Sequence, residues 1–242
     1  MKLILENLEK RFDKKVIFDK ASFTFEKGKI YGLLGRNGAG KTTLFNSISR
    51  NLALDGGKIF LEDEAGNRNN QYDNTDIGFI YTQPNLPDFM TGAEFIQFFM
   101  DINAAKLKER KTVEEHLLSV GIQRDDQHKL LKDYSHGMKN KVQMLVTFMV
   151  MPPVILLDEP LTSFDLIAAH EIKELILSIK SDSIIIFSTH ILQLAQDLCD
   201  ELVLLHDQKL TPVDVTIMHD KDFEDQVIAL LTDEEDRDGV NE

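Results

Sequence analysis

A glycine-rich segment between a short apolar run and a helical pattern constrains the fold of this chain more than any other feature. Residues 30–50 read IYGLLGRNGAGKTTLFNSISR. Residues 35–42 match the pattern G-x-x-x-x-G-K-[ST], which requires a strand before it and a helix after it. The alternative is an ordinary glycine turn, and the flanking context favours a phosphate-binding loop in an α/β domain.

The residue types of this loop suit phosphate chemistry. Glycines leave successive backbone N–H groups accessible, so that these groups can point at phosphate oxygens. A helix that starts near Gly40 adds unpaired N–H groups and the positive end of its dipole. Lys41 can place an ammonium near the β and γ phosphates, and the Thr42 hydroxyl can ligate Mg²⁺. The predicted nucleotide-binding residues of the loop are Gly35, Asn37, Gly38, Ala39, Gly40, Lys41, Thr42 and Thr43.

Length and composition allow one large α/β domain or a core with an inserted subdomain, because the chain has 242 residues and 43% hydrophobic content. Cys199 is the single cysteine, which excludes an internal disulfide and fits a reducing compartment. Met1 is followed directly by a strand-like pattern, and no apolar run approaches the roughly 18 residues of a membrane span. We therefore expect a soluble, cytoplasmic chain.

The charge is unevenly distributed. The formal net charge of −14 argues against a nucleic-acid surface. Residues 219–242 contain ten Asp or Glu and two Lys or Arg, and so carry −8 of this charge. Such runs usually stay solvated. We predict a domain over 1–218 and an acidic C-terminal tail over 219–242, with a docking role of the tail as the alternative.

The first thirty residues predict antiparallel strands in KLILENLEKRF and ASFTFEKGKI, with the charged KKVIFDK between them. Phe12 lies upstream of the phosphate loop, where an aromatic ring can stack on a nucleotide base or pack at a strand end. The isolated sequence favours packing. Further strands are predicted in KIFLED and IGFIY, with an Asn-rich loop between them.

A helical insertion is predicted over about 84–150. Apolar residues recur at helical spacing from Phe95 to Ile102, and residues 112–120 give another short helix. Gln83 occupies a hinge-like position just before the insertion. Ser135 is a plausible N-cap of the helix that follows, and with the N–H groups near Gly137 it can alternatively bind an anion.

A second decisive signal is VILLDEP, a continuous apolar run that ends in Asp158 and Glu159. Such runs are typical of buried parallel strands, and their carboxyl ends face the ligand crevice of an open α/β sheet. Beside a phosphate loop, one carboxylate can hold Mg²⁺ and the other can deprotonate an attacking water. Simple turn residues are the alternative, and the loop favours catalysis.

The strand pattern recurs in SIIIF, which is followed by Ser188, Thr189 and His190. A lone histidine is usually structural, but His190 falls on the ligand edge of the predicted sheet. Cys199 completes an apolar helical pattern from Ile191, so we interpret it as an unreactive core residue. ELVLLH is predicted as the last strand.

The order of these motifs resembles the nucleotide-binding subunit of ATP-binding cassette (ABC) transporters over about residues 1–210. The resemblance implies a P-loop NTPase (RecA-like) core with an antiparallel β subdomain and an inserted helical subdomain. It makes residues 35–43 the Walker A loop and Gln83 the Q-loop residue, a contact for Mg²⁺ and for the membrane partner. The remaining implied roles are signature for Ser135 and Gly137, Walker B for Asp158, catalytic base for Glu159, D-loop for Asp165, switch histidine for His190 and adenine stacking for Phe12.

Two motifs depart from the family pattern. The signature, usually Leu-Ser-Gly-Gly-Gln, reads Tyr134-Ser135-His136-Gly137-Met138, and the D-loop has Ser163-Phe164-Asp165 in place of Gly-Leu-Asp. The serine, the second glycine and the aspartate are retained. The resemblance therefore implies an active Mg²⁺-dependent ATPase that converts ATP and water to ADP and phosphate.

The resemblance also implies partners. Two such subunits, in a homodimer or heterodimer, would enclose ATP between one Walker loop and the other signature. Separate integral membrane transporter subunits would hold the chain at the inner face of the cell membrane. Bacterial exporters of peptides, drugs or lipids are the subgroup that it resembles. The alternative is a non-transport ABC ATPase that acts on a nucleic-acid or ribosome complex, for which the chain shows no basic face.

Overall fold

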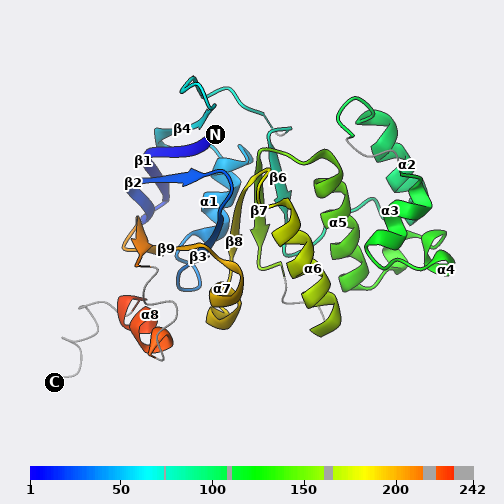
Figure 1. Cartoon of the computed structure of the whole chain (residues 1–242). Coiled ribbons are helices and arrows are strands. Elements are labelled where there is room, and N and C mark those ends of the chain that lie inside the picture. The colour runs from blue at the N-terminus through cyan, green and yellow to red at the C-terminus, as the bar shows by residue number, and fades with distance from the viewer. Residues whose placement is uncertain (74, 108–110, 161–165, 215–221, 232–242) are drawn as a thin grey trace.

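The computed structural model describes residues 1–73, 75–107, 111–160, 166–214 and 222–231. Two β-sheets enclose helix α1, and a group of helices lies at the far side of the larger sheet (Figure 1). The strands are β1 (Lys2–Phe12), β2 (Lys15–Glu26), β3 (Ile30–Leu34), β4 (Gly56–Glu62), β5 (Arg68–Asn69), β6 (Ile77–Ile80), β7 (Val154–Asp158), β8 (Ile184–Ser188), β9 (Glu201–His206) and β10 (Lys209–Val213). The helices are α1 (Lys41–Ile48), α2 (Gly92–Ile102), α3 (Val113–Ser119), α4 (Arg124–Gln127), α5 (His136–Val150), α6 (Leu166–Ile179), α7 (Leu192–Leu198) and α8 (Phe223–Leu231), with a 3₁₀ turn η1 (Leu131–Asp133).

The six-stranded sheet has the order β10-β9-β3-β8-β7-β6, and all its neighbours are parallel except β9 and β10. In β7, Val154 and Leu156 pack toward α1 and the smaller sheet, whereas Ile155 and Leu157 pack toward α5 and α6. Both faces are thus buried, as a continuous apolar strand requires. The parallel arrangement brings the carboxyl ends of β3, β7 and β8 to one edge, as predicted.

The four-stranded sheet has the order β2-β1-β4-β5 and is antiparallel. The prediction that a charged segment separates two strands here is wrong. KKVIFDK lies almost wholly within β2, which is one strand from Lys15 to Glu26. Its charged side chains are exposed while Ile17 and Phe18 are buried. The segment predicted as an Asn-rich loop also contains the short strand β5, which pairs with the end of β4.

The predicted helices of the insertion are present as α2, α3 and α5, and α4 is an additional short helix between α3 and α5. Thr91 and Thr112 each form a capping box, with Glu94 and Glu115 respectively. Ile96, Leu117, Leu131 and Val142 share one buried cluster, so these helices have their own core. None of the described helices is long and apolar enough to cross a bilayer.

The prediction that ELVLLH is the last strand is wrong, because β10 and α8 follow it. Among the described strands, β10 pairs only with β9, so Pro212 lies in an edge strand, where a missing N–H is tolerated. In α8, Phe223 and Val227 are buried against Leu34 and Ala195. Part of the stretch predicted as an acidic tail is therefore packed; residues 219–221 and 232–242 of that stretch lie outside the described residues. The predicted domain bounds, 1–218 with an insertion over about 84–150, remain predictions.

Candidate functional site

The loop between β3 and α1 has the backbone that a phosphate site needs. Gly38 and Gly40 have φ angles of 78° and 114°, in the region that favours glycine. A Cβ atom at Gly35 would lie 2.8 Å from the Leu205 carbonyl oxygen, and one at Gly40 would lie 2.5 Å from Ile17 Cγ2. α1 begins at Lys41 with no side-chain cap, so its first N–H groups remain available to an anion.

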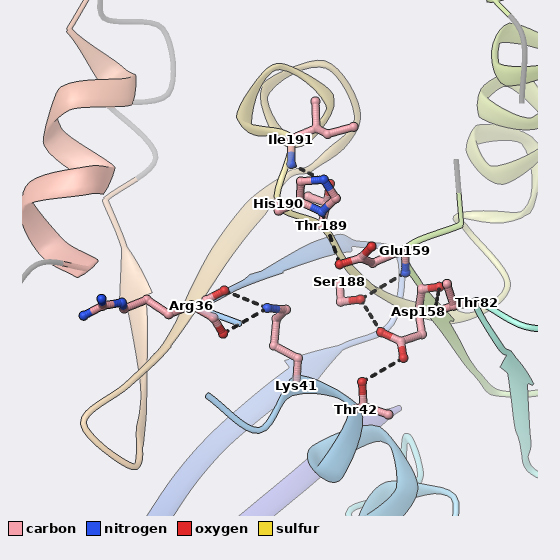
Figure 2. A network of polar contacts seen from close by, with 11 residues as sticks. Arg36, Lys41, Thr42, Thr82, Asp158, Glu159, Ser188, Thr189, His190 and Ile191 are labelled. Carbon is pink, nitrogen blue, oxygen red and sulfur yellow. Dashed lines mark hydrogen bonds and ion pairs between the residues drawn. The ribbon is translucent and has the colours of Figure 1, made fainter. Parts of the chain in front are cut away.

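Lys41 folds back over this loop. Its Nζ donates to the carbonyl oxygens of Gly35, at 2.6 Å, and Arg36, at 3.3 Å (Figure 2). The side chain is buried, and burial lowers the pKa of the ammonium, although the carboxylates of Glu159 and Asp158 oppose this shift. The loop thus holds a positive charge at its centre. A bound phosphate would replace the two carbonyl oxygens as the acceptor of hydrogen bonds from the Lys41 ammonium.

Asp158 connects α1 to the sheet. Its Oδ2 accepts from the Thr42 hydroxyl at 2.9 Å, and its Oδ1 accepts from the Ser188 hydroxyl at 2.6 Å. Asp158 is buried, and its backbone oxygen accepts from the Thr82 hydroxyl at 2.9 Å. These contacts fix one carboxylate beside the first turn of α1 (Figure 2).

Glu159 follows Asp158 and lies at the open side of the site. Its backbone has a φ of 51°, which is uncommon for a residue with a side chain. Its N–H donates to Ser188 Oγ at 3.1 Å, and its Oε1 lies 3.2 Å from His190 Nδ1. The two side chains are 25% and 56% exposed respectively, so both can reach a bound molecule.

Other predicted site residues lie outside this network. Phe12 is 45% exposed at the end of β1, with the Lys10 ammonium 5.2 Å from its ring centre. An exposed ring is open to stacking, which the isolated sequence did not favour. The Gln83 side chain is exposed, and it makes no hydrogen bond among the described residues.

The signature residues lie in the helical region. Ser135 is the N-cap of α5, and its Oγ accepts from the Met138 N–H at 3.2 Å. Ser135 is exposed and Gly137 is partly exposed. No hydrogen bond within the described part of the chain links either residue to Lys41 or Asp158. Asp165 lies outside the described residues.

The donor set is compatible with Mg²⁺. Thr42 Oγ1 and Asp158 Oδ2 are oxygens of the type that Mg²⁺ prefers, and they lie 2.9 Å apart. Over the described residues, no group of three or more His, Cys, Asp or Glu could hold a metal by itself. Mg²⁺ is typically bound by one or two protein oxygens, water and substrate phosphates, so these residues fit an ion that arrives with a nucleotide.

The sequence prediction gave no role to Ser188 and did not single out Thr82, although both touch Asp158. The signal for Ser188 was a hydroxyl at the end of a buried strand. Its relevance depends on the pairing of Asp158 with Ser188 in the β7–β8 register, and sequence alone does not show which strands are neighbours.

The chain is similar in sequence to known proteins of one family. A family model described as ABC transporter matches residues 18–162. An uncharacterized ABC transporter ATP-binding protein of Nostoc sp. (strain PCC 7120) is 33% identical over 203 residues, which cover 81% of this chain but only 59% of that protein. Bacitracin transport ATP-binding protein BcrA of Enterococcus faecalis is 30% identical over 217 residues, which cover 88% of this chain and 70% of that protein.

Solved structures agree at the level of the fold. An ATP binding subunit of an ABC transporter has a TM-score of 0.76 at 22% identity, with 98% of this chain and 97% of that chain covered. A dimeric post-hydrolysis state of the ATP-binding cassette MJ0796, bound to ADP and Pi, has a TM-score of 0.72 at 18% identity, with 88% and 98% covered. The fold class predicted from the sequence is confirmed.

Proposed function

Because the chain belongs to the ABC transporter family as an ATP-binding cassette domain, we propose that it is the Mg²⁺-dependent, ATP-hydrolysing subunit of an exporter. One observation carries the proposal. Lys41, Thr42, Asp158, Glu159 and His190 come from three separate parts of the chain and lie in one set of contacts at the carboxyl edge of the sheet.

Each of these residues has a distinct task. The loop N–H groups and Lys41 bind the phosphates, and Thr42 and Asp158, joined by Gln83, hold the metal. Mg²⁺, when bound, neutralises charge that builds up on the phosphates. Glu159 accepts a proton from the attacking water, and His190 donates a hydrogen bond to the γ-phosphate. Catalysis is then positioning and charge stabilisation, which suits phosphoryl transfer.

Two chains are needed for a complete site in this proposal. Among the residues that the structure describes, Ser135 and Gly137 make no hydrogen bond to the phosphate loop of their own chain, and the start of α5 offers a hydroxyl and N–H groups to an anion. The signature of a second subunit would therefore cover the ATP bound by the first. The cassette MJ0796, whose solved structure is described as dimeric, supports a dimer for this chain.

A membrane partner is proposed from two observations. BcrA is named as a bacitracin transport protein, which supports a role in transport, and we propose export of a peptide, drug or lipid as its direction. In addition, Phe89, Phe98 and Ile102 are 80%, 51% and 62% exposed in and near α2. Exposed apolar side chains of this kind fit contact with another protein. The chain would act at the inner face of the cell membrane through that partner.

Phosphate release by the purified chain tests the hydrolysis and the dimer together. We expect release from ATP in the presence of Mg²⁺, and the rate per chain should rise with protein concentration because two chains form each site. EDTA should stop the reaction. Absence of phosphate release at every protein concentration, from a chain that binds ATP, would contradict the assignment of an active ATPase.

Replacement of His190 by alanine is expected to slow hydrolysis about 100-fold, the scale for loss of one donor to developing charge. ATP affinity should change little, because Lys41 and the loop remain. Rapid-mix phosphate assays and equilibrium ATP binding measure the two effects. His128→Ala, which removes an exposed imidazole after α4, is the control. An unchanged rate for His190→Ala would exclude the switch role of His190.

A further inference from the structure

Ser188 is a fully buried hydroxyl between the two proposed catalytic carboxylate residues. It pairs with Asp158 in the parallel register of β7 and β8. Its hydroxyl donates to Asp158 Oδ1 at 2.6 Å and accepts from the Glu159 N–H at 3.1 Å. One side chain therefore contacts the side chain of the first residue and the backbone of the second (Figure 2).

Both contacts restrain geometry that catalysis needs. Asp158 Oδ2 already accepts from Thr42, so the bond from Ser188 to Oδ1 fixes the rotation of the carboxylate. Glu159 has a φ of 51°, and a non-glycine residue adopts this conformation only where its surroundings enforce it. The bond from its N–H to Ser188 is a local restraint of this kind, and it sets the direction in which the Glu159 side chain leaves the strand.

Thr82 restrains the same junction from the opposite side. β7 lies between β8 and β6 in the sheet, and Thr82 follows the end of β6. Its hydroxyl donates to the Asp158 backbone oxygen at 2.9 Å. The peptide that joins Asp158 to Glu159 is therefore held at its carbonyl by Thr82 and at its N–H by Ser188.

We propose that Ser188 and Thr82 form a two-sided clamp on the Asp158–Glu159 peptide, and that Ser188 is a positioning residue for ATP hydrolysis. Ser188 does not touch the reacting atoms; it acts through Asp158 on the metal and through Glu159 on the attacking water. The inference rests on the proposed function and adds two residues to it. Thr82 also links the clamp to its neighbour Gln83.

A purely structural buried serine is the competing explanation, and the residue just before the same strand provides a matched control. Ser183 lies just before β8, at the opposite edge of the sheet, is also fully buried, and donates to the Pro152 carbonyl oxygen at 2.7 Å. Ser183→Ala removes a buried hydroxyl and one donated hydrogen bond but leaves the clamp intact, whereas Ser188→Ala removes a buried hydroxyl with one donated and one accepted hydrogen bond.

The test compares Ser188→Ala with Ser183→Ala. For Ser188→Ala we expect kcat to fall about 10- to 100-fold, the usual cost of losing a residue that orients metal ligands, while KM for ATP changes less than about threefold. Thr82→Val, which keeps the side-chain shape, should lower kcat by a smaller factor of about 3 to 10 because one restraint remains. Ser183→Ala should keep the parental kcat, although its melting temperature should fall about as much as that of Ser188→Ala.

A second readout does not depend on turnover. The dissociation constant of a non-hydrolysable ATP analogue is measured by calorimetry with Mg²⁺ and with EDTA. Ser188→Ala should reduce the Mg²⁺-dependent gain in affinity about tenfold, whereas Ser183→Ala should leave it unchanged.

Parental kcat and a parental Mg²⁺ effect in Ser188→Ala would overturn the clamp. Equal losses in the two serine variants would also overturn it, because they would show a general effect of a buried hydroxyl. If Ser188→Ala does not fold, parental kcat in Thr82→Val overturns it. Failure of the proposed function has a different result, since the parental chain itself would then not hydrolyse ATP.

Discussion

Glu159→Gln is expected to reduce ATP turnover about 1,000-fold and to leave ATP affinity close to the parental value. The carboxamide has nearly the shape of the carboxylate, but it cannot accept the proton of an attacking water. The Glu159 Oε1 atom lies 3.2 Å from His190 Nδ1, whereas the proposed phosphate-binding groups come from the loop and Lys41. This variant should therefore keep ATP binding and lose ATP turnover.

The fold should survive this substitution because the contact that holds Glu159 in place uses its backbone. The N–H to Ser188 Oγ bond is present in both forms, and the side chain is partly exposed. A chain that binds ATP without hydrolysing it should accumulate as a dimer around two nucleotides. Light scattering after gel filtration with ATP measures this, with the parental chain as the monomeric reference.

Glu64→Gln is the matched control, since it makes the same chemical change at an exposed loop position. It should keep the parental rate and the parental mass in solution. Glu159→Gln with the parental rate of phosphate release would remove Glu159 as the base. A variant that hydrolyses ATP slowly but remains monomeric with ATP would support Glu159 as the base. The same result would contradict the prediction that ATP closes a dimer.

The core of the fold was predictable because its strands carry strong local signals. Residues 154–157 and 184–187 are continuous apolar runs, and both proved buried on two faces of one sheet. The rule that parallel strands end at one edge then placed Asp158, Glu159 and His190 near the loop. The resemblance to the ABC family, which the comparisons confirm, then assigned a role to each motif.

The final elements were missed because their signals are weak or contradictory. Pro212 argues against a strand, yet β10 is an edge strand and tolerates it. The acidic residues around Phe223 predict a solvated tail, but Phe223 and Val227 have the i, i+4 spacing of a buried helix face and pack on Leu34. Two large apolar residues at that spacing outweighed the charge of their neighbours.

The clamp residues were missed for a different reason. The hydroxyls of Ser188 and Thr82 gain a role only when β8, β7 and β6 are adjacent and in register. Register is a property of three strands from distant parts of the chain, so no local pattern reports it. The roles of Gln83, Ser135 and Gly137 require a bound nucleotide or a second chain, and they stay predictions.

Lys41→Ala is expected to weaken ATP binding about 100-fold, which corresponds to about 2.7 kcal/mol, the scale of a hydrogen bond between charged groups. The lost group is an ammonium at the centre of the phosphate loop. Adenosine, which has no phosphate, should bind the variant and the parental chain equally weakly. This comparison isolates the phosphate contact from stacking of the base on Phe12.

The variant should stay folded, because Lys41 is not a source of stability in the free chain. Burial lowers the pKa of its ammonium, which means that the charged form is disfavoured there, and its two hydrogen bonds go to carbonyls of two loop residues that are not buried. A melting temperature at or slightly above the parental value is expected. Removal of a structural lysine should lower it instead.

Lys180→Ala supplies that contrast. Lys180 pairs with Asp200, which anchors the amino end of β3 through the Ile30 N–H, at the opposite edge of the sheet. This variant loses one charge and one ion pair, so it should melt earlier but bind ATP as the parental chain does. ATP binding by Lys41→Ala at parental affinity would refute the phosphate-loop assignment. Equal weakening for ATP and adenosine would instead show that the substitution had disrupted the site as a whole.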